Sequence, residues 1–147
     1  MKKLIQKLFI IIYHHLYHTF AFAYDRIALF VSGGEWFDWV KQTLQFVDKK
    51  SIVLEIGFGT GILFDEITKL GNRIFGIDES QSMIRITKKK IYPKYGIPKI
   101  VRGNAKYLPY PPDSFDLIIA TFPGEFVFDL LFKTEIERRK IRKFSEI

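Results

Sequence analysis

Residues 53–61 decide the fold, and they read VLEIGFGTG. The first four residues are apolar apart from Glu55, which is typical of a short buried strand. Three glycines follow at alternate positions, Gly57, Gly59 and Gly61, and apolar residues at helical spacing begin at Ile62. Glycines between a strand and a helix let the backbone approach a ligand, and the helix N-terminus offers it free N–H groups. The stretch therefore predicts a strand, a ligand-binding turn and a helix.

Strands and helices alternate from this turn toward the C-terminus. The predicted strands are 52–56, 73–77, 98–101 and 115–121, and the predicted helices are 62–70, 81–91 (ended by Pro93) and 125–139. The last strand is nearly all apolar, which favours burial on both faces. This order predicts an α/β fold, a Rossmann-like parallel sheet with helices on both faces, over residues 51–147.

The first 50 residues differ from the rest in composition. Residues 1–40 hold ten of the 24 aromatic residues and all three histidines, His14, His15 and His18. Apolar residues recur at helical spacing from Leu4 to Leu16 and from Trp36 to Val47, and residues 32–34 (SGG) separate two helical stretches. We therefore predict an aromatic helical cap segment over 1–50, preceding the sheet domain of 51–147.

Composition excludes several classes of protein. The chain of 147 residues has no cysteine, which excludes disulfides, thiolate metal sites and cysteine nucleophiles. The three histidines lack a nearby carboxylate, so no metal site is predicted. The apolar run at 8–13 is too short to span a bilayer, which takes about 20 residues, and histidines interrupt it, which disfavours a signal peptide. We expect a cytoplasmic protein whose N-terminal helix packs on the domain or lies on a membrane surface.

The spacing of the glycines separates two classes of cofactor. The pattern is G-x-G-x-G, and Ile62 occupies the place of the third glycine of the dinucleotide fingerprint, which disfavours NAD and FAD. Glu55 can face an ammonium group but repels a pyrophosphate. Asp78 ends the next strand, where a carboxylate can accept hydrogen bonds from both hydroxyls of a ribose. One carboxylate for an amine and one for a ribose favour S-adenosylmethionine.

At these residues the chain resembles the class I S-adenosylmethionine-dependent methyltransferases. Residues 103–105 (GNA) are similar to the third-strand G-[DN]-A segment of that family. Residues 108–119 (LPYPPDSFDLII) are similar to the L-P-[FY]-x-[DE]-x-S-F-D-hydrophobic stretch of its small-molecule branch, methyltransferase type 11, which includes methyltransferases of quinone biosynthesis. The resemblance covers residues 51–138.

The resemblance implies a cofactor site for S-adenosyl-L-methionine. Glu55, Gly57, Gly59 and Gly61 would hold its methionine portion, and Asp78 its ribose. Asn104 and Ala105 would flank the adenine, Thr121 and Phe122 would close the site, and Tyr24 would cover it. The remaining residues of the expected site are Phe58, Thr60, Glu79 and Met83. Three alternatives stay open: Asp78 as a helix N-cap, Asn104 as a turn residue, and Tyr24 as a core residue.

The expected reaction is direct displacement at the sulfonium methyl by a small acceptor. The aromatic cap segment favours an apolar, lipid-like or quinone-like acceptor. No catalytic residue is assigned; Tyr24 and the histidines are the candidates for a base. Members of the family continue through a fifth strand and an antiparallel pair, whereas residues 139–147 here read RKIRKFSEI. We therefore expect a truncated domain of about four strands, with the fourth as an unpaired edge, and its activity is in question.

Other function classes are kept as alternatives. One is an inactive cofactor-binding or interaction module that forms oligomers through the exposed edge, and another is a nicotinamide oxidoreductase. A DNA adenine or cytosine-N4 acceptor is disfavoured, because residues 120–124 (ATFPG) lack the [DN]-P-P-[FYW] motif of the amino-group nucleic-acid enzymes, and nucleic acid is not expected as a partner. Residues 85–106 carry eight basic and no acidic residues; a solvated face is expected, with a contact to RNA or an anionic membrane as alternatives.

Overall fold

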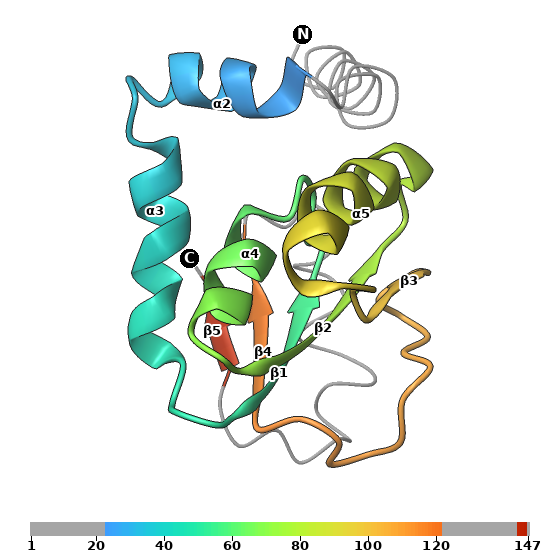
Figure 1. The fold of residues 1–147 in the computed structure, drawn as a ribbon. Coiled ribbons are helices and arrows are strands. Elements are labelled where there is room, and N and C mark those ends of the chain that lie inside the picture. The colour runs from blue at the N-terminus through green and yellow to red at the C-terminus, as the bar shows by residue number, and fades with distance from the viewer. Residues whose placement is uncertain (1–22, 122–143, 147) are drawn as a thin grey trace, which may run out of the picture.

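The computed structural model describes residues 23–121 and 144–146 (Figure 1). The predicted helices over 4–16 and 125–139, the three histidines and Phe122 lie outside these residues. The described elements, in chain order, are α2 (Tyr24–Val31), α3 (Trp36–Gln42), the 3-10 helix η2 (Thr43–Phe46), β1 (Ile52–Ile56), α4 (Ile62–Lys69), β2 (Arg73–Asp78), α5 (Gln81–Tyr95), β3 (Ile100–Arg102), β4 (Leu117–Ala120) and β5 (Phe144–Glu146).

The five described strands form one parallel sheet in the order β3-β2-β1-β4-β5. In the register of β1, Glu55 lies beside Gly76 of β2, and Ile56 lies beside Ala120 of β4. Because all strands run the same way, their carboxyl ends lie together along one side of the sheet, which we call the carboxyl edge. The loops that follow β1, β2, β3 and β4 gather there. This confirms the predicted Rossmann-like α/β fold.

The prediction that the fourth strand forms an unpaired edge is wrong. β5 pairs in parallel with β4, from Ile118 beside Phe144 to Ala120 beside Glu146. The sheet therefore has five described strands, with β3 and β5 at its edges. A strand of three residues after a basic run carries too little alternation to be recognised in the sequence. Pairing gives the apolar β4 a partner on both sides, so the edge of the sheet passes from β4 to the short β5.

The two faces of the sheet are covered differently. On one face, alternate residues of β1, β2 and β4 pack against α3, α4 and α5; this first cluster includes Val53, Phe64 and Ile119. On the other face, the intervening strand residues pack against the segment between β3 and β4, which contributes Leu108 and partly buried aromatic residues. Figure 1 shows α4 and α5 in front of the sheet, α3 along its side and α2 above the carboxyl ends of the strands.

Three helices end at other residues than predicted. α4 ends one residue earlier, at Lys69. α5 continues through the exposed Pro93 to Tyr95, and Gly96, at φ 81°, ends the helix. The helix predicted over 36–47 ends at Gln42 and continues as the 3-10 helix η2. The break predicted over 32–34 is confirmed between α2 and α3.

Candidate functional site

The turn after β1 contains three glycines with left-handed backbone conformation, and it packs against α5. Gly57, Gly59 and Gly61 have φ values of 67°, 53° and 74°. A Cβ on Gly61 would lie 2.6 Å from Cγ2 of Thr87, so both its conformation and its close contact require glycine. The hydroxyl of Thr87 donates to the carbonyl of Gly59 at 2.9 Å. Thr87 was not predicted as a site residue, because nothing in the sequence distinguishes a helical threonine that bonds to the glycine turn from any other.

Gly57 opens the turn toward solvent. It is exposed, and a Cβ added to it would meet no atom within 4 Å. Phe58, by contrast, turns inward: it is buried and packs edge-on against Phe64, with ring centroids 6.3 Å apart. A ligand at this turn therefore meets the backbone of Gly57, whereas the side chain of Phe58 belongs to the core.

Glu55 is a buried carboxyl group with one unpartnered oxygen among the described residues. Its side chain is 1% exposed, and its Oε2 has no hydrogen-bond partner among the described residues. Burial raises the pKa of Glu55 well above its ordinary value, the negative charge of Asp78 raises it further, and Lys90 of α5 partly opposes the rise. A carboxyl group left in this state accommodates a cationic or hydrogen-donating partner.

Asp78 is equally buried but is held by the backbone. Its Oδ2 accepts a hydrogen bond from the N–H of Gly59 at 2.9 Å, and its Oδ1 accepts one from the N–H of Ser80 at 2.8 Å. The N-cap of α5 is Ser80, whose hydroxyl accepts from the N–H of Met83. Asp78 thus fastens the glycine turn to the end of β2.

The residues expected near an adenine form a small exposed cluster. The side-chain amide of Asn104 donates to the carboxylate of Glu79, and both side chains are exposed. Oδ1 of Asn104 also accepts from the N–H of Lys106 at 2.8 Å, which is the turn geometry kept as an alternative. Ala105 packs on the second core cluster, and Met83 is fully buried.

The cap segment reaches the glycine turn through α2. The hydroxyl of Thr60 donates to Oδ1 of Asp25 at 2.7 Å. Tyr24, the preceding residue, is half-buried and lies edge-on to Trp36 of α3, with ring centroids 5.9 Å apart. Tyr24 was predicted from the sequence to cover the site. The structure adds the hydrogen bond between Asp25 and Thr60.

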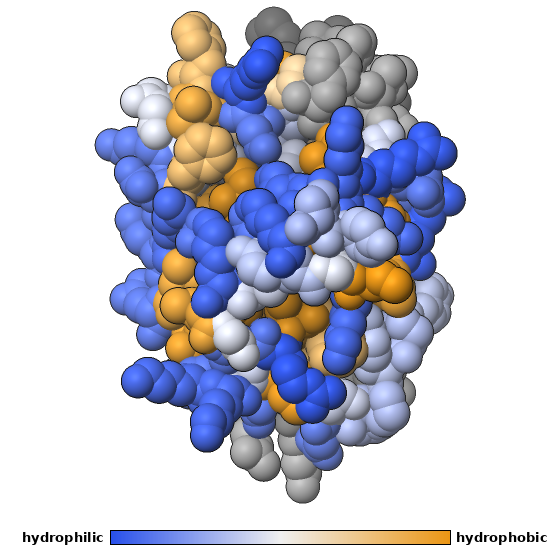
Figure 2. Space-filling view, viewed as in Figure 1, coloured by the Kyte–Doolittle hydropathy of each residue, from blue (hydrophilic) through white to orange (hydrophobic). Residues whose placement is uncertain are grey.

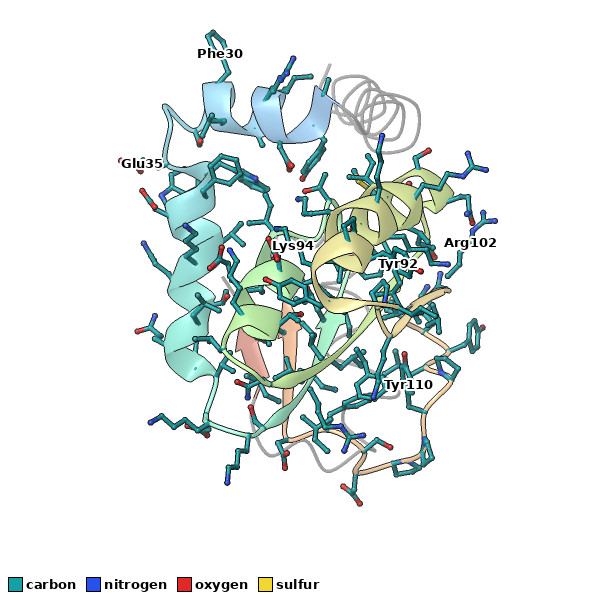
Figure 3. All side chains as sticks on the ribbon, in the orientation of Figure 1. Phe30, Glu35, Tyr92, Lys94, Arg102 and Tyr110 are labelled. Atoms are coloured by element: carbon teal, nitrogen blue, oxygen red, sulfur yellow. The ribbon has the colours of Figure 1, made fainter. Side chains whose placement is uncertain are left out.

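An ion pair between Lys94 and Asp65 joins α4 to α5 beside the turn, and Lys69 of α4 lies near the same carboxylate. Lys94 Nζ lies 2.8 Å from Asp65 Oδ2, and Lys69 Nζ lies 3.7 Å from the same oxygen. Figure 3 shows Lys94 reaching from α5 toward α4. Burial pushes the pKa of Asp65 upward, but the hydrogen bond from Lys94 and the charge of Lys69 outweigh it and lower the pKa. Both helices that flank the turn are thereby held in place.

The structure thus brings most of the expected site residues to the carboxyl ends of the strands. Glu55 lies near the end of β1 and Asp78 ends β2. The glycine turn follows β1, the Glu79–Asn104 pair follows β2 and β3, and the half-buried Thr121 follows β4. The side chains of Phe58 and Met83 lie in the core instead. In the described part of the chain no three metal-binding side chains lie together, and no helix is long and apolar enough to cross a membrane.

Comparison with known proteins identifies the family of this arrangement. Residues 54–138, which contain the glycine turn and three of the strands that follow it, match the family model of a methyltransferase domain. The chain belongs to this family. Its fold and its sequence relatives place it among the class I S-adenosylmethionine-dependent methyltransferases.

Two curated relatives of this methyltransferase chain are named for steps of quinone biosynthesis. A demethylmenaquinone methyltransferase from Lysinibacillus sphaericus is 28% identical over 80% of this chain and 52% of its own length. A ubiquinone/menaquinone biosynthesis C-methyltransferase from a Marinomonas species is 31% identical over 73% of this chain and 45% of its own length. The chain spans about half the length of the curated relatives it matches.

Solved structures agree on the fold. A protein from Pyrococcus horikoshii superposes with a TM-score of 0.62 at 21% identity, over 76% of this chain and 57% of the other. A dimethyladenosine transferase from Plasmodium falciparum is 30% identical with a TM-score of 0.57, over 73% of this chain and 38% of the other. The fold of this chain is thus shared with both proteins.

Proposed function

We propose that this chain binds S-adenosylmethionine at the carboxyl edge of its sheet and serves methyl transfer to a small apolar, quinone-like acceptor. The observation that carries the cofactor is the pair of buried carboxyl groups beside an open glycine turn. S-Adenosylmethionine would supply the chemistry, an electrophilic methyl group on a sulfonium that is left as a neutral thioether when the acceptor takes the methyl and loses a proton.

The residues present fit this cofactor. Oε2 of Glu55, which has no partner among the described residues, suits an ammonium group, and that group would also favour the charged form of a carboxyl group that burial otherwise disfavours. The carboxylate of Asp78, at the end of β2, suits the hydroxyls of a ribose. The backbone of Gly57 is exposed, with open space beside it. The Glu79–Asn104 pair and Ala105 lie after the neighbouring strands, where the adenine is expected, and Tyr24 and Thr121 flank the same edge.

The chain's own contribution to the reaction would be alignment. Fixing the two reactants in a water-poor site can lower a barrier by about 7–11 kcal/mol without any covalent role for the protein. The fastened glycine turn and the paired helices α4 and α5 provide such rigidity. The quinone-like acceptor is supported by the names of the relatives and by the aromatic residues of α2 and α3, Tyr24 and Trp36 among them.

Calorimetric titration with S-adenosylhomocysteine tests the cofactor, with NADH as the control ligand and an Asp78→Ala variant. Saturable binding that the variant loses would support the site. A folded chain that binds NADH and not S-adenosylhomocysteine would favour the oxidoreductase alternative, and one that binds neither would refute the proposed function.

An adenine base in RNA is the second candidate acceptor. Its support is the likeness to a dimethyladenosine transferase and the acid-free basic segment at 85–106, most of whose basic side chains are exposed. Figure 2 shows hydrophilic side chains gathered over α5, which carries much of this segment. Methyl transfer from labelled S-adenosylmethionine to a short-chain naphthoquinol, compared with transfer to an RNA transcript at two salt concentrations, separates the two acceptors.

A further inference from the structure

A side-chain hydrogen bond connects the cap segment to the glycine turn. Thr60 is 5% exposed and lies in the middle of the turn, and its hydroxyl donates to Oδ1 of Asp25 at 2.7 Å. Asp25 lies in the first turn of α2, thirty-five residues earlier in the sequence. The contact therefore joins α2 to the glycine turn, two segments that are far apart in the sequence.

α2 has few apolar anchors of its own. Its side chains from Tyr24 to Phe30 are all half-buried or exposed, and Phe30, at 88% exposure, points away from the molecule in Figure 3. The anchored end is the one that carries Tyr24 and Asp25. There Tyr24 lies edge-on to Trp36, which packs against the first core cluster. A polar contact at this end has a large share in fixing α2, because little buried apolar area competes with it.

The charge of a cation on α5 also acts on this carboxylate. Lys90 of α5 is half-buried; its burial lowers the pKa of its ammonium group, and the negative charges of Asp25, Asp65 and Glu55 oppose that effect. Asp25 thus accepts a hydrogen bond from Thr60 and interacts electrostatically with the ammonium group of Lys90. Thr60 lies within the glycine turn, and Lys90 lies one helical turn beyond Thr87, which donates to the carbonyl of Gly59.

We propose that Asp25 and Thr60 form a latch, which positions α2 over the glycine turn and slows release of the cofactor. This inference rests on the proposed function, because it assumes that the cofactor lies at that turn. Asp25 is a positioning residue here: it acts on the ligand through the placement of α2. Opening the latch would free Tyr24 and the start of α2, and a bound ligand would then leave faster while its contacts with the sheet edge stay the same.

Two rate measurements test the latch. The dissociation rate of S-adenosylhomocysteine is followed by stopped flow, with Trp36 and Trp39 of α3, the two tryptophans of the chain, as the signal. Amide hydrogen exchange of residues 24–31 is measured without ligand. Thr60→Val, which removes the hydroxyl but keeps the shape, is expected to speed dissociation about tenfold and to raise the exchange of α2, as expected for loss of a hydrogen bond to a charged group. Thr60→Ser restores the hydroxyl and is expected to restore both rates.

Matched variants separate the latch from general loss of stability. Thr68→Val makes the same change on α4, where the hydroxyl donates only to the carbonyl of Phe64 at 2.7 Å, and it should leave both rates unchanged. Asp25→Ala should match Thr60→Val, and the double variant should add nothing to either. Unchanged rates in Thr60→Val, or additive effects in the double variant, would overturn the latch. A wild-type chain that binds no S-adenosylhomocysteine would refute the proposed function and the role in release, whereas hydrogen exchange still decides whether the contact holds α2.

Discussion

The ends of β1 and β2 carry carboxyl groups of equal burial and opposite surroundings. Glu55 is 1% exposed and Asp78 is 3% exposed. Asp78 accepts hydrogen bonds from two backbone N–H groups, and Glu55 keeps an oxygen without a partner among the described residues. The hydrogen bonds to Asp78 stabilise the fold, because they compensate a buried anion. The unpartnered oxygen of Glu55 costs stability, which a bound ligand can restore. We propose that Glu55 serves chiefly to bind the ligand, whereas Asp78 also holds the glycine turn to the end of β2.

The largest effect is expected from the turn that connects the two carboxyl groups. Gly61→Ala combines a left-handed backbone with a clash against Thr87, and it should destabilise the fold by about 2–5 kcal/mol. Gly57→Ala has the same sign of φ but open space around it, so its cost should be about 1–2 kcal/mol. Urea denaturation compares the two variants. Equal costs would mean that the packing of the turn against α5 contributes nothing.

The carboxyl group of β2 gives the next largest effect. Asp78→Asn places an amide N–H₂ opposite a backbone N–H and should lower the free energy of unfolding by about 1–3 kcal/mol. The same isosteric change at β1, Glu55→Gln, removes a poorly compensated buried charge and should raise that free energy by about 1 kcal/mol. Thermal or urea unfolding at pH 8 measures both. The comparison fails if the two variants shift stability in the same direction.

The pH dependence of stability should carry the signature of Glu55. Its pKa is raised in the folded protein, so the charged form penalises folding at pH values above the folded pKa. The penalty fades as the pH falls through that value and is gone below the unfolded pKa of 4.5. The stability gained by Glu55→Gln should therefore be largest at alkaline pH and vanish in acid. A constant difference between variant and wild type from pH 4 to pH 9 would contradict the raised pKa.

A third carboxyl group supplies the smallest effect and a reference. Asp65 is paired with two lysines, and Lys94 is about half exposed, so Lys94→Gln should cost only about 0.5 kcal/mol and less at high salt. Unfolding in 50 mM and 500 mM salt checks this. A cost as large as that of Asp78→Asn would show that exposed ion pairs, rather than buried backbone contacts, hold the sheet edge.

The sequence predicted the fold and the place of the site better than the state of its residues. The strands, the glycine turn and the carboxylates after β1 and β2 follow from alternation, glycine spacing and order, because these patterns are local. The orientation of Phe58 toward the core depends on packing between segments that the sequence pattern does not relate. The same holds for the contacts of Thr87 and Asp25 with the turn. β5 was missed because three residues give no periodic signal.

The most direct test of the account compares two ligands on two variants. S-Adenosylhomocysteine carries an ammonium group, and 5′-methylthioadenosine keeps the adenine, the ribose and the thioether but lacks the amino-acid portion. If the end of β1 receives the ammonium group, Glu55→Gln should weaken binding of S-adenosylhomocysteine about tenfold or more and leave 5′-methylthioadenosine unaffected. Asp78→Asn should weaken both ligands alike. Equal weakening of both ligands by Glu55→Gln, or of neither, would contradict the division of roles between the two strand ends.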